Sequence, residues 1–161
     1  IPLRLVGSEM CIRDSHNPDI KFDKKNSTFA DVYCGSGSIG IEALSRGFKH
    51  CHFNDIDNAQ INKISIFLKN FTNLNYNLSD IDIDNELNQI PWSNFDVIYF
   101  DPPYEIKLEP IILKKIEKIK NQAIVITETS HKIFETAQST YSKSYKNKFI
   151  NFFFAKNLKK L

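Results

Sequence analysis

The chain has 161 residues, 42% of them hydrophobic and 25% charged, which fits one globular domain and is too short for two ordinary ones. The net charge of +2 excludes nucleic-acid binding through a strongly basic overall field, so such binding needs a local patch. The three cysteines lack the spacing of a zinc site or disulfide framework, and no apolar run is long enough to span a membrane. We therefore expect a cytoplasmic monomer with no metal and no membrane partner.

The first fifteen residues, IPLRLVGSEMCIRDS, differ from the Asn-, Lys- and Ile-rich remainder and contain the single methionine, Met10. They read like translated sequencing-adapter sequence, with an ordinary amphipathic arm as the alternative. We expect residues 1–15 to be a non-native or disordered arm and residues 16–161 to form the single domain. The natural protein is then expected to extend further at its N-terminus.

Strand-like and helix-like segments alternate along the remainder. Apolar, β-prone composition predicts strands over 28–34, 50–55, 75–80, 95–104 and 122–129. Helical periodicity predicts helices over 39–46, 59–70, 85–89 and 109–120, the third of them weak. Residues 141–157 predict a hairpin that turns near 146–148. The alternation indicates βαβ units, and hence an α/β fold with a mostly parallel sheet and an antiparallel C-terminal hairpin.

Three glycines, Gly35, Gly37 and Gly40, form the pattern G-x-G-x-x-G between the first strand and the first helix. Such a loop brings backbone close to an adenosine-bearing cofactor. The loop alone fits NAD, FAD and other cofactors of this kind equally well. The identity of the cofactor therefore depends on residues elsewhere in the chain.

Aspartates follow the next three predicted strands, and ligands of open parallel sheets bind beyond these strand ends. Asp55 lies about twenty residues after the glycine loop, where a carboxylate can accept hydrogen bonds from both ribose hydroxyls. A helix N-cap is the alternative role, for which the neighbouring Asp57 is the better candidate. Asp80 fits either a contact with an adenine amino group or a plain turn residue. Asp101 is the polar residue at the end of the fourth predicted strand.

The segment Asp101-Pro102-Pro103-Tyr104 discriminates between cofactor classes. Two consecutive prolines stiffen the backbone and remove two amide donors. A carboxylate, a carbonyl oxygen and an aromatic ring then lie side by side, which suits a planar base with an exocyclic amine. Asp101 and the Pro102 carbonyl would accept the amine hydrogens while Tyr104 stacks on the ring. A turn that merely closes a strand is the alternative.

The sequences DVYCGSGSIGIEALSRG, NDID and FDVIYFDPPY resemble those of the RsmD family, bacterial methyltransferases that act on guanine N2 of small-subunit (16S) ribosomal RNA. The resemblance covers nearly everything after residue 28. It implies S-adenosylmethionine as cofactor, ribosomal RNA or the small subunit as partner, and a Rossmann-like class I methyltransferase fold with a seven-stranded sheet.

Carried over by position, the resemblance implies site residues in two groups. The catalytic group is Asp101, Pro102, Pro103 and Tyr104, and the cofactor-binding group is Asp31, Tyr33, Gly35, Ser36, Gly37, Asp55, Ile56 and Asp80. The chain departs mildly from the family pattern at Asp55, where Glu is more usual, and at Tyr33 and Cys34. A larger departure is that the family's N-terminal hairpin and Arg-Pro-Thr segment are not visible here.

Three other functions remain as alternatives. A nicotinamide oxidoreductase explains the glycine loop but gives Asp101 to Tyr104 no role. A DNA adenine-N6 methyltransferase faces the same chemistry, yet no DNA-recognition insert is evident. A non-catalytic fragment that binds cofactor or RNA is the third. The lysines at 143, 146 and 148, which alternate with aromatic residues, are candidates for contacts with RNA phosphate or for a solvated hairpin.

Overall fold

The computed structural model describes residues 23–85, 89–139 and 141–161. The arm expected over 1–15 lies outside these residues, as do the three central residues of the helix expected over 85–89. Among the described residues, no helix combines the length and the apolar character needed to cross a membrane.

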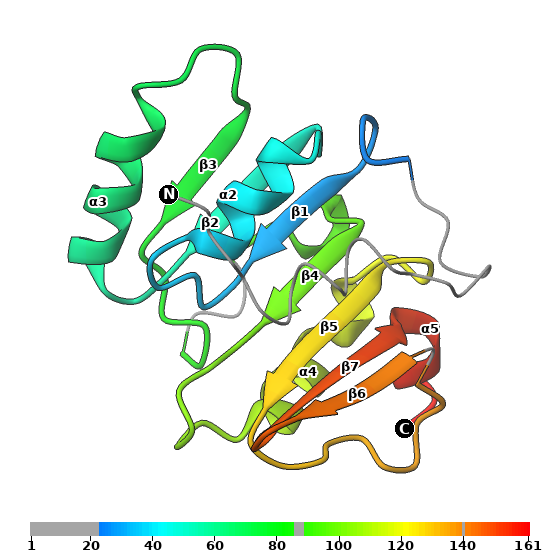
Figure 1. Ribbon diagram of the computed structural model, residues 1–161. Coiled ribbons are helices and arrows are strands. Elements are labelled where there is room, and N and C mark those ends of the chain that lie inside the picture. Colours follow the sequence, from blue (N-terminus) through cyan, green and yellow to red (C-terminus); the bar gives the residue numbers. More distant parts are fainter. Residues whose placement is uncertain (1–22, 86–88, 140) are drawn as a thin grey trace.

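Seven strands of the described chain form one sheet in the order β3-β2-β1-β4-β5-β7-β6 (Figure 1). The first five strands in the chain run parallel, and β7 runs antiparallel to both β5 and β6. The α/β fold with an antiparallel C-terminal hairpin, predicted from the sequence, is thereby confirmed. The strand bounds are β1 Thr28–Asp31, β2 His50–Asn54, β3 Tyr76–Ser79, β4 Val97–Phe100, β5 Ile124–Thr129, β6 Tyr141–Tyr145 and β7 Lys148–Phe154.

Helices cover both faces of the sheet because successive strand residues point to opposite faces. On one face, α2 (Ser38–Ser45) and α3 (Asn58–Leu68) pack on β1 and β2 through a cluster that includes Phe29 and Phe53. On the other, α4 (Leu108–Lys115) and α5 (Ala155–Leu158) pack on a cluster around Phe100. Two 3-10 turns, Trp92–Asn94 and Ile116–Lys118, complete the layers.

Four elements differ from the predictions. The strand expected over 95–104 covers only Val97–Phe100, because the chain leaves the sheet at the two prolines that follow Asp101. The first strand ends at Asp31 instead of residue 34, because the chain turns there into the glycine loop. The helix expected over 109–120 ends at Lys115 and continues as the 3-10 turn Ile116–Lys118. The short helix α5 was not predicted, since its four residues are too few to show a helical period.

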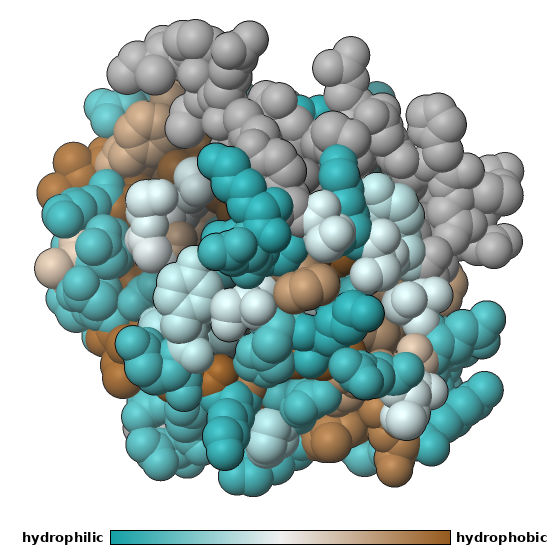
Figure 2. Space-filling view, turned by 60° about the horizontal axis from the view of Figure 1, so that its bottom comes forward, coloured by the Kyte–Doolittle hydropathy of each residue, from teal (hydrophilic) through white to brown (hydrophobic). Residues whose placement is uncertain are grey.

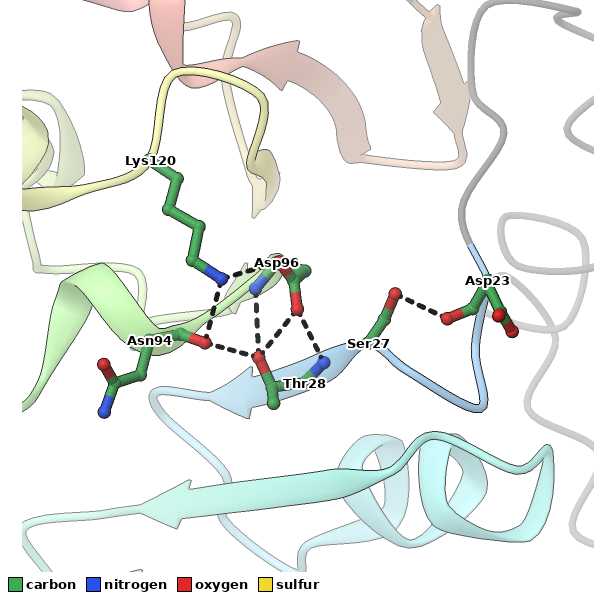
Figure 3. A network of polar contacts seen from close by, with 6 residues as sticks. All are labelled: Asp23, Ser27, Thr28, Asn94, Asp96 and Lys120. Carbon is green, nitrogen blue, oxygen red and sulfur yellow. Dashed lines mark hydrogen bonds and ion pairs between the residues drawn. The ribbon is translucent and has the colours of Figure 1, made fainter.

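A polar network joins β1 to β4 at the amino ends of the strands (Figure 3). Asp96 accepts hydrogen bonds from the Thr28 backbone N–H at 2.9 Å and from Lys120 Nζ at 2.7 Å. Thr28 Oγ1 donates to the Asn94 carbonyl at 2.6 Å. Burial acts to raise the pKa of Asp96, but the hydrogen bonds from Lys120 and Thr28 leave it below its usual value. The network fixes the strand ends that lie away from the glycine loop.

Gly40 sets how closely α2 approaches the sheet. A Cβ at this position would lie 2.2 Å from the ring carbon Cε1 of Phe53 and 2.8 Å from Sγ of Cys51. The third glycine of the motif therefore permits close helix–strand packing, which is its usual role in such loops.

We predict that Gly40→Ala lowers the free energy of unfolding by about 2 to 3 kcal/mol, since overpacking outweighs the better helix propensity of alanine. Urea denaturation measures this loss of stability. Gly47→Ala is the matched control: its φ of 89° strains alanine, but nothing lies within 4 Å of its Cβ. We expect this control to cost only about 1 kcal/mol. Equal losses in both variants would contradict the packing explanation.

Candidate active site

The carboxyl ends of the parallel strands surround a cavity of about 420 Å³. Figure 2 shows the molecule turned so that this end comes forward, and hydrophilic side chains cover most of that face, with smaller apolar patches between them. The loops after β1, β2, β3 and β4 all contribute to the walls of the cavity. The lining residues are Tyr33, Gly35, Asn54, Asp55, Ile56, Ile81, Asp82, Ile83, Asp84, Asp101, Pro102, Pro103, Tyr104, Ile106 and Lys148.

The glycine loop forms one wall and is held there by Asp55. Gly35 has a φ of 49°, in the left-handed region, and a Cβ on it would meet nothing within 4 Å. Its N–H donates to Asp55 Oδ2 at 2.7 Å, and the Asp57 N–H donates to Asp55 Oδ1 at 2.9 Å. Asp57 caps α3 through the Ala59 N–H, as predicted. Asp55 is therefore left facing the cavity with its orientation fixed by two amides.

Asp31 lies behind the loop and is not among the lining residues of the cavity. Its side chain is fully buried and accepts a hydrogen bond from the Gly40 N–H at 2.9 Å. Burial raises the pKa of Asp31 to about 7, against the lowering effect of that hydrogen bond. The structure thus places Asp31 as a support for the start of α2. Ser36 and Gly37 also belong to the loop without lining the cavity.

Asn54 ties three strand ends together and was not identified from the sequence. Its buried side-chain amide donates to the Val32 carbonyl at 3.2 Å and to the Ile81 carbonyl at 3.0 Å. Its side-chain oxygen accepts from Ser79 Oγ at 2.6 Å and from the Ile81 N–H at 3.0 Å. Every polar atom of this side chain is paired. The segments after β1 and β3 are therefore fixed relative to β2.

The chain after β3 lines the cavity at positions other than the predicted one. Asp80 is exposed, accepts a hydrogen bond from Asn58 Nδ2 at 2.8 Å and does not line the cavity. Asp82 and Asp84 do line it, and Tyr33 Oη lies 3.5 Å from Asp84 Oδ1. Burial, followed by the charge of Asp84, raises the pKa of Tyr33 well above its usual value, so the phenol stays neutral.

The predicted segment Asp101 to Tyr104 forms a second wall of the cavity that Gly35 and Asp55 also line. The Pro103 carbonyl accepts a hydrogen bond from the Ile106 N–H at 3.0 Å. Within the described part of the chain, no group donates to the Pro102 carbonyl. Tyr104 is 69% exposed, which is unusual for a residue with a large aromatic side chain. A carboxylate, a carbonyl acceptor and an open aromatic surface therefore meet at this wall.

Residues of β5 and β7 reach the same wall. Lys148, at the start of β7, forms an ion pair with Glu128 of β5, and its Nζ lies 4.0 Å from Asp101 Oδ2. Burial, and then the charge of Glu128, raise the pKa of Asp101 to about 6, while Lys148 acts to lower it. Lys148, one of the three hairpin lysines considered for RNA phosphate, is thus engaged with two carboxylates.

Asn54, Asp82 and Glu128 are site residues that sequence reasoning missed, and Lys148 was considered only for RNA phosphate. The rule that ligands gather at strand ends was applied to four strands, and applying it to the fifth would have identified Glu128. No comparable signal existed for the contacts of Lys148 with Glu128 and Asp101, because they depend on the antiparallel register of β7 against β5. Among the described residues, no group of three or more His, Cys, Asp or Glu side chains could hold a metal ion.

A family model described as conserved hypothetical protein 95 matches residues 12–153 of this chain. The chain belongs to this family. Two relatives named ribosomal RNA small subunit methyltransferase D also match, which confirms the RsmD resemblance. That of Haemophilus influenzae is 33% identical over 110 residues, or 62% of this chain and 54% of the relative. That of Buchnera aphidicola is 30% identical over 108 residues, or 61% of this chain and 50% of the relative. The chain thus spans about half the length of these relatives.

Solved structures confirm the expected methyltransferase fold of this RsmD-family chain. A Haemophilus influenzae protein described as a methylase is similar with a TM-score of 0.69 and 26% identity, covering 80% of this chain and 86% of that one. The rRNA methyltransferase AviRa of Streptomyces viridochromogenes has a TM-score of 0.65 at 12% identity, covering 84% of this chain and 79% of that one. At 12% identity, the similarity to AviRa concerns the fold alone.

We predict that Asn54→Leu lowers the free energy of unfolding by about 3 kcal/mol, because it leaves buried backbone groups of Val32 and Ile81 without partners. Urea denaturation measures the loss. Asn62→Leu on the exposed side of α3 makes the same exchange, and we expect it to change stability by no more than about 0.5 kcal/mol. Similar effects of the two substitutions would show that the Asn54 network is not essential.

Proposed function

We propose that this chain transfers a methyl group from S-adenosylmethionine to the exocyclic N2 amine of a guanine in small-subunit ribosomal RNA. The observation that carries the proposal is that one cavity has the glycine loop with Asp55 on one wall and Asp101 to Tyr104 on the other. A cofactor on the first wall and a planar amine-bearing base on the second would meet between them.

The first wall fits the adenosine part of the cofactor. The cavity volume of about 420 Å³ lies in the range of small-molecule sites. Asp55 already accepts two backbone amides, and each carboxylate oxygen keeps a further lone pair for a ribose hydroxyl. Tyr33, Ile56 and Ile83 add apolar surface for the adenine. Asp82, which lines the cavity, is better placed than Asp80 to meet the adenine amine.

The second wall fits the target base. The Asp101 carboxylate and the Pro102 carbonyl would accept the two amine hydrogens, while the exposed ring of Tyr104 stacks on the base. Because N2 of a paired guanine lies within the helix groove, the base must be unpaired or flipped before it can reach this wall. Such a base can enter from the side where Tyr104 is open to solvent.

The chain's own groups need to align and polarise the amine more than to remove a proton. When bound, S-adenosylmethionine supplies an activated methyl group on a sulfonium. Hydrogen bonds to Asp101 and Pro102 keep the amine lone pair out of the ring and directed at that methyl group. Positive charge develops on the nitrogen during attack, and the fixed negative charge of Asp101 stabilises it. The proton can then leave to Asp101 or to water.

The described cysteines favour an amine over a ring carbon as the target. Methylation of a pyrimidine carbon requires a nucleophile that first adds to the ring, and a thiolate is the usual one. Cys34 and Cys51 are buried, and burial raises the pKa of both thiols above the usual value. Neither lines the cavity. The names of the RsmD relatives support ribosomal RNA, free or within the small subunit, as the proposed partner.

We predict that S-adenosylmethionine binds the purified chain and that NADH does not, as measured by isothermal titration calorimetry. Asp55→Ala should weaken binding at least tenfold, since it removes the ribose acceptor and the anchor of the Gly35 amide. Asp82→Ala should weaken it and Asp80→Ala should not, because only Asp82 lines the cavity. Binding of NADH in place of the methyl donor would overturn the cofactor assignment.

We further predict that Asp101→Ala lowers the rate of methyl transfer about 100-fold or more while S-adenosylmethionine still binds. The assay follows transfer of a labelled methyl group to ribosomal RNA from a strain that lacks the modification, with digestion to identify the methylated nucleoside. DNA containing unpaired adenine serves as the competing substrate. Methyl-adenine as the product would replace the guanine-N2 assignment, and cofactor binding without transfer would indicate a binding fragment.

A further inference from the structure

We call the segment Asp101 to Tyr104 the target-base wall. Three residues beside it have no part in the proposed chemistry, yet they form a connected chain of polar contacts. Tyr99 of β4 donates a hydrogen bond through its hydroxyl to Glu128 Oε2 at 2.5 Å. The other oxygen of Glu128 is paired with the ammonium group of Lys148. That ammonium lies 4.0 Å from Asp101 Oδ2. A line of contacts thus leads from the buried sheet to the carboxylate of the target-base wall.

Glu128 gives Lys148 a fixed anchor. The side chain of Glu128 is only 14% exposed, and Tyr99 is buried in the sheet. Burial, and then the nearby charge of Glu128, raise the pKa of Tyr99 far above its usual value, so its hydroxyl remains a donor. Hydrogen bonding to Glu128 also helps to raise the pKa of Lys148 against the effect of burial. Lys148 therefore stays charged and close to Glu128.

We propose that Lys148 is a positioning residue for the target-base wall: anchored on Glu128, it keeps Asp101 ionised and holds its Oδ2 in place. The inference rests on the proposed function, because Asp101 must be an acceptor only if it receives the amine of a base. A protonated Asp101 would present an O–H group to an amine that needs to donate, and would lose the negative charge that stabilises the attacking nitrogen.

The charges around Asp101 explain why a cation is needed there. Burial, and then the like charge of Glu128, disfavour the ionised form of Asp101 and bring its pKa to about 6. Asp31, behind the glycine loop, is a further carboxyl group within electrostatic reach. Tyr99 faces the cluster as a neutral phenol, and Tyr104 interacts with Lys148 from the open side. Lys148 supplies the only positive charge that lowers the pKa of Asp101 among the described residues.

Lys148 differs in its surroundings from the other lysine of the same turn, Lys146. Lys146 lies at the exposed hairpin turn with a φ of 52°, whereas Lys148 is partly buried and lines the cavity. A lysine that served only RNA phosphate would gain nothing from a partly buried carboxylate beside it, since the pair weakens its attraction for an anion. The ion pair thus favours action on Asp101 over direct phosphate binding.

The first experiment measures the titration of the Asp101 side-chain carboxyl by carbon-detected NMR in the unliganded chain. Lys148→Gln should raise the pKa of Asp101, because Glu128 then repels its charge without compensation. Glu128→Gln should lower the pKa of Asp101, because the like charge is lost while the amide oxygen of the new side chain still accepts a hydrogen bond from Lys148. Lys148→Arg should restore a value near that of the unmodified chain. A general loosening of the wall would move the first two variants in the same direction and would overturn the proposal.

Lys160→Gln is the control for charge, since it removes one lysine from the exposed C-terminal end of the chain, beyond α5. It should leave the titration of Asp101 unchanged. An unchanged Asp101 in Lys148→Gln would contradict the proposal directly. This measurement needs no substrate, so its result stands even if the proposed methyl transfer is not found.

The second experiment measures methyl transfer against pH. In the unmodified chain the rate should rise with pH through about 6, where half of the Asp101 side chains are ionised. If Lys148→Gln raises the pKa of Asp101 by about one unit, only about a tenth of these side chains are ionised at pH 6, so the rate at pH 6, as a fraction of the plateau rate, falls about fivefold compared with the unmodified chain. Lys148→Arg should recover the profile.

A different result identifies the phosphate role instead. If Lys148→Gln raises the KM for RNA equally at every pH and leaves the profile of kcat in place, Lys148 binds RNA directly and the proposal is wrong. Absence of transfer by the unmodified chain at any pH would count against the proposed function, while the Asp101 titration would still test the effect of Lys148 on that carboxyl.

Discussion

The site depends first on the side chain of Asn54, at the end of β2, which satisfies four backbone and hydroxyl groups at the ends of the two flanking strands, β1 and β3. Parallel strands end in loops that have no ladder to hold them, and a buried loop must find partners for its backbone groups. Asn54 provides these partners without carrying a charge into the core. Because it directly precedes Asp55, the network that joins the strands also sets the starting point of the wall formed by the glycine loop and Asp55, to which we assign the cofactor.

The two walls to which we assign the cofactor and the target base, the glycine loop with Asp55 and the segment Asp101 to Tyr104, are stabilised by different means. At the glycine loop, Asp55 and Asp31 accept backbone amides, so that short fixed hydrogen bonds determine the shape. At the other wall, the two prolines restrict the backbone and a lysine lies between two carboxylates. The first wall suits a ligand bound mainly by shape. The second combines charge with an open aromatic ring, which suits a base that must enter, be held by its amine and leave.

The antiparallel hairpin has a role at the site as well as at the sheet edge. The pairing of β7 with β5 covers the last parallel strand and brings Lys148 to the carboxyl end of the sheet, next to Glu128. An additional parallel strand in that place would start at the other end of the sheet. The reversal of direction therefore places the first residue of β7 at the site and its last residue beside α5, at the far end (Figure 1).

The sequence by itself determined the features that arise from local patterns: the alternation of strands and helices, the glycine loop, the cap at Asp57 and the stiff Asp101-Pro102-Pro103-Tyr104 corner. These follow from residue spacing and backbone restriction, which act over a few positions. Only the tertiary structure decided that Asp82 lines the cavity where Asp80 does not, that Asn54 joins three strands, and that Lys148 meets Glu128 and Asp101. Those contacts join residues 20 to 50 positions apart, and a strand register that shifts by one residue would reverse which side chains meet.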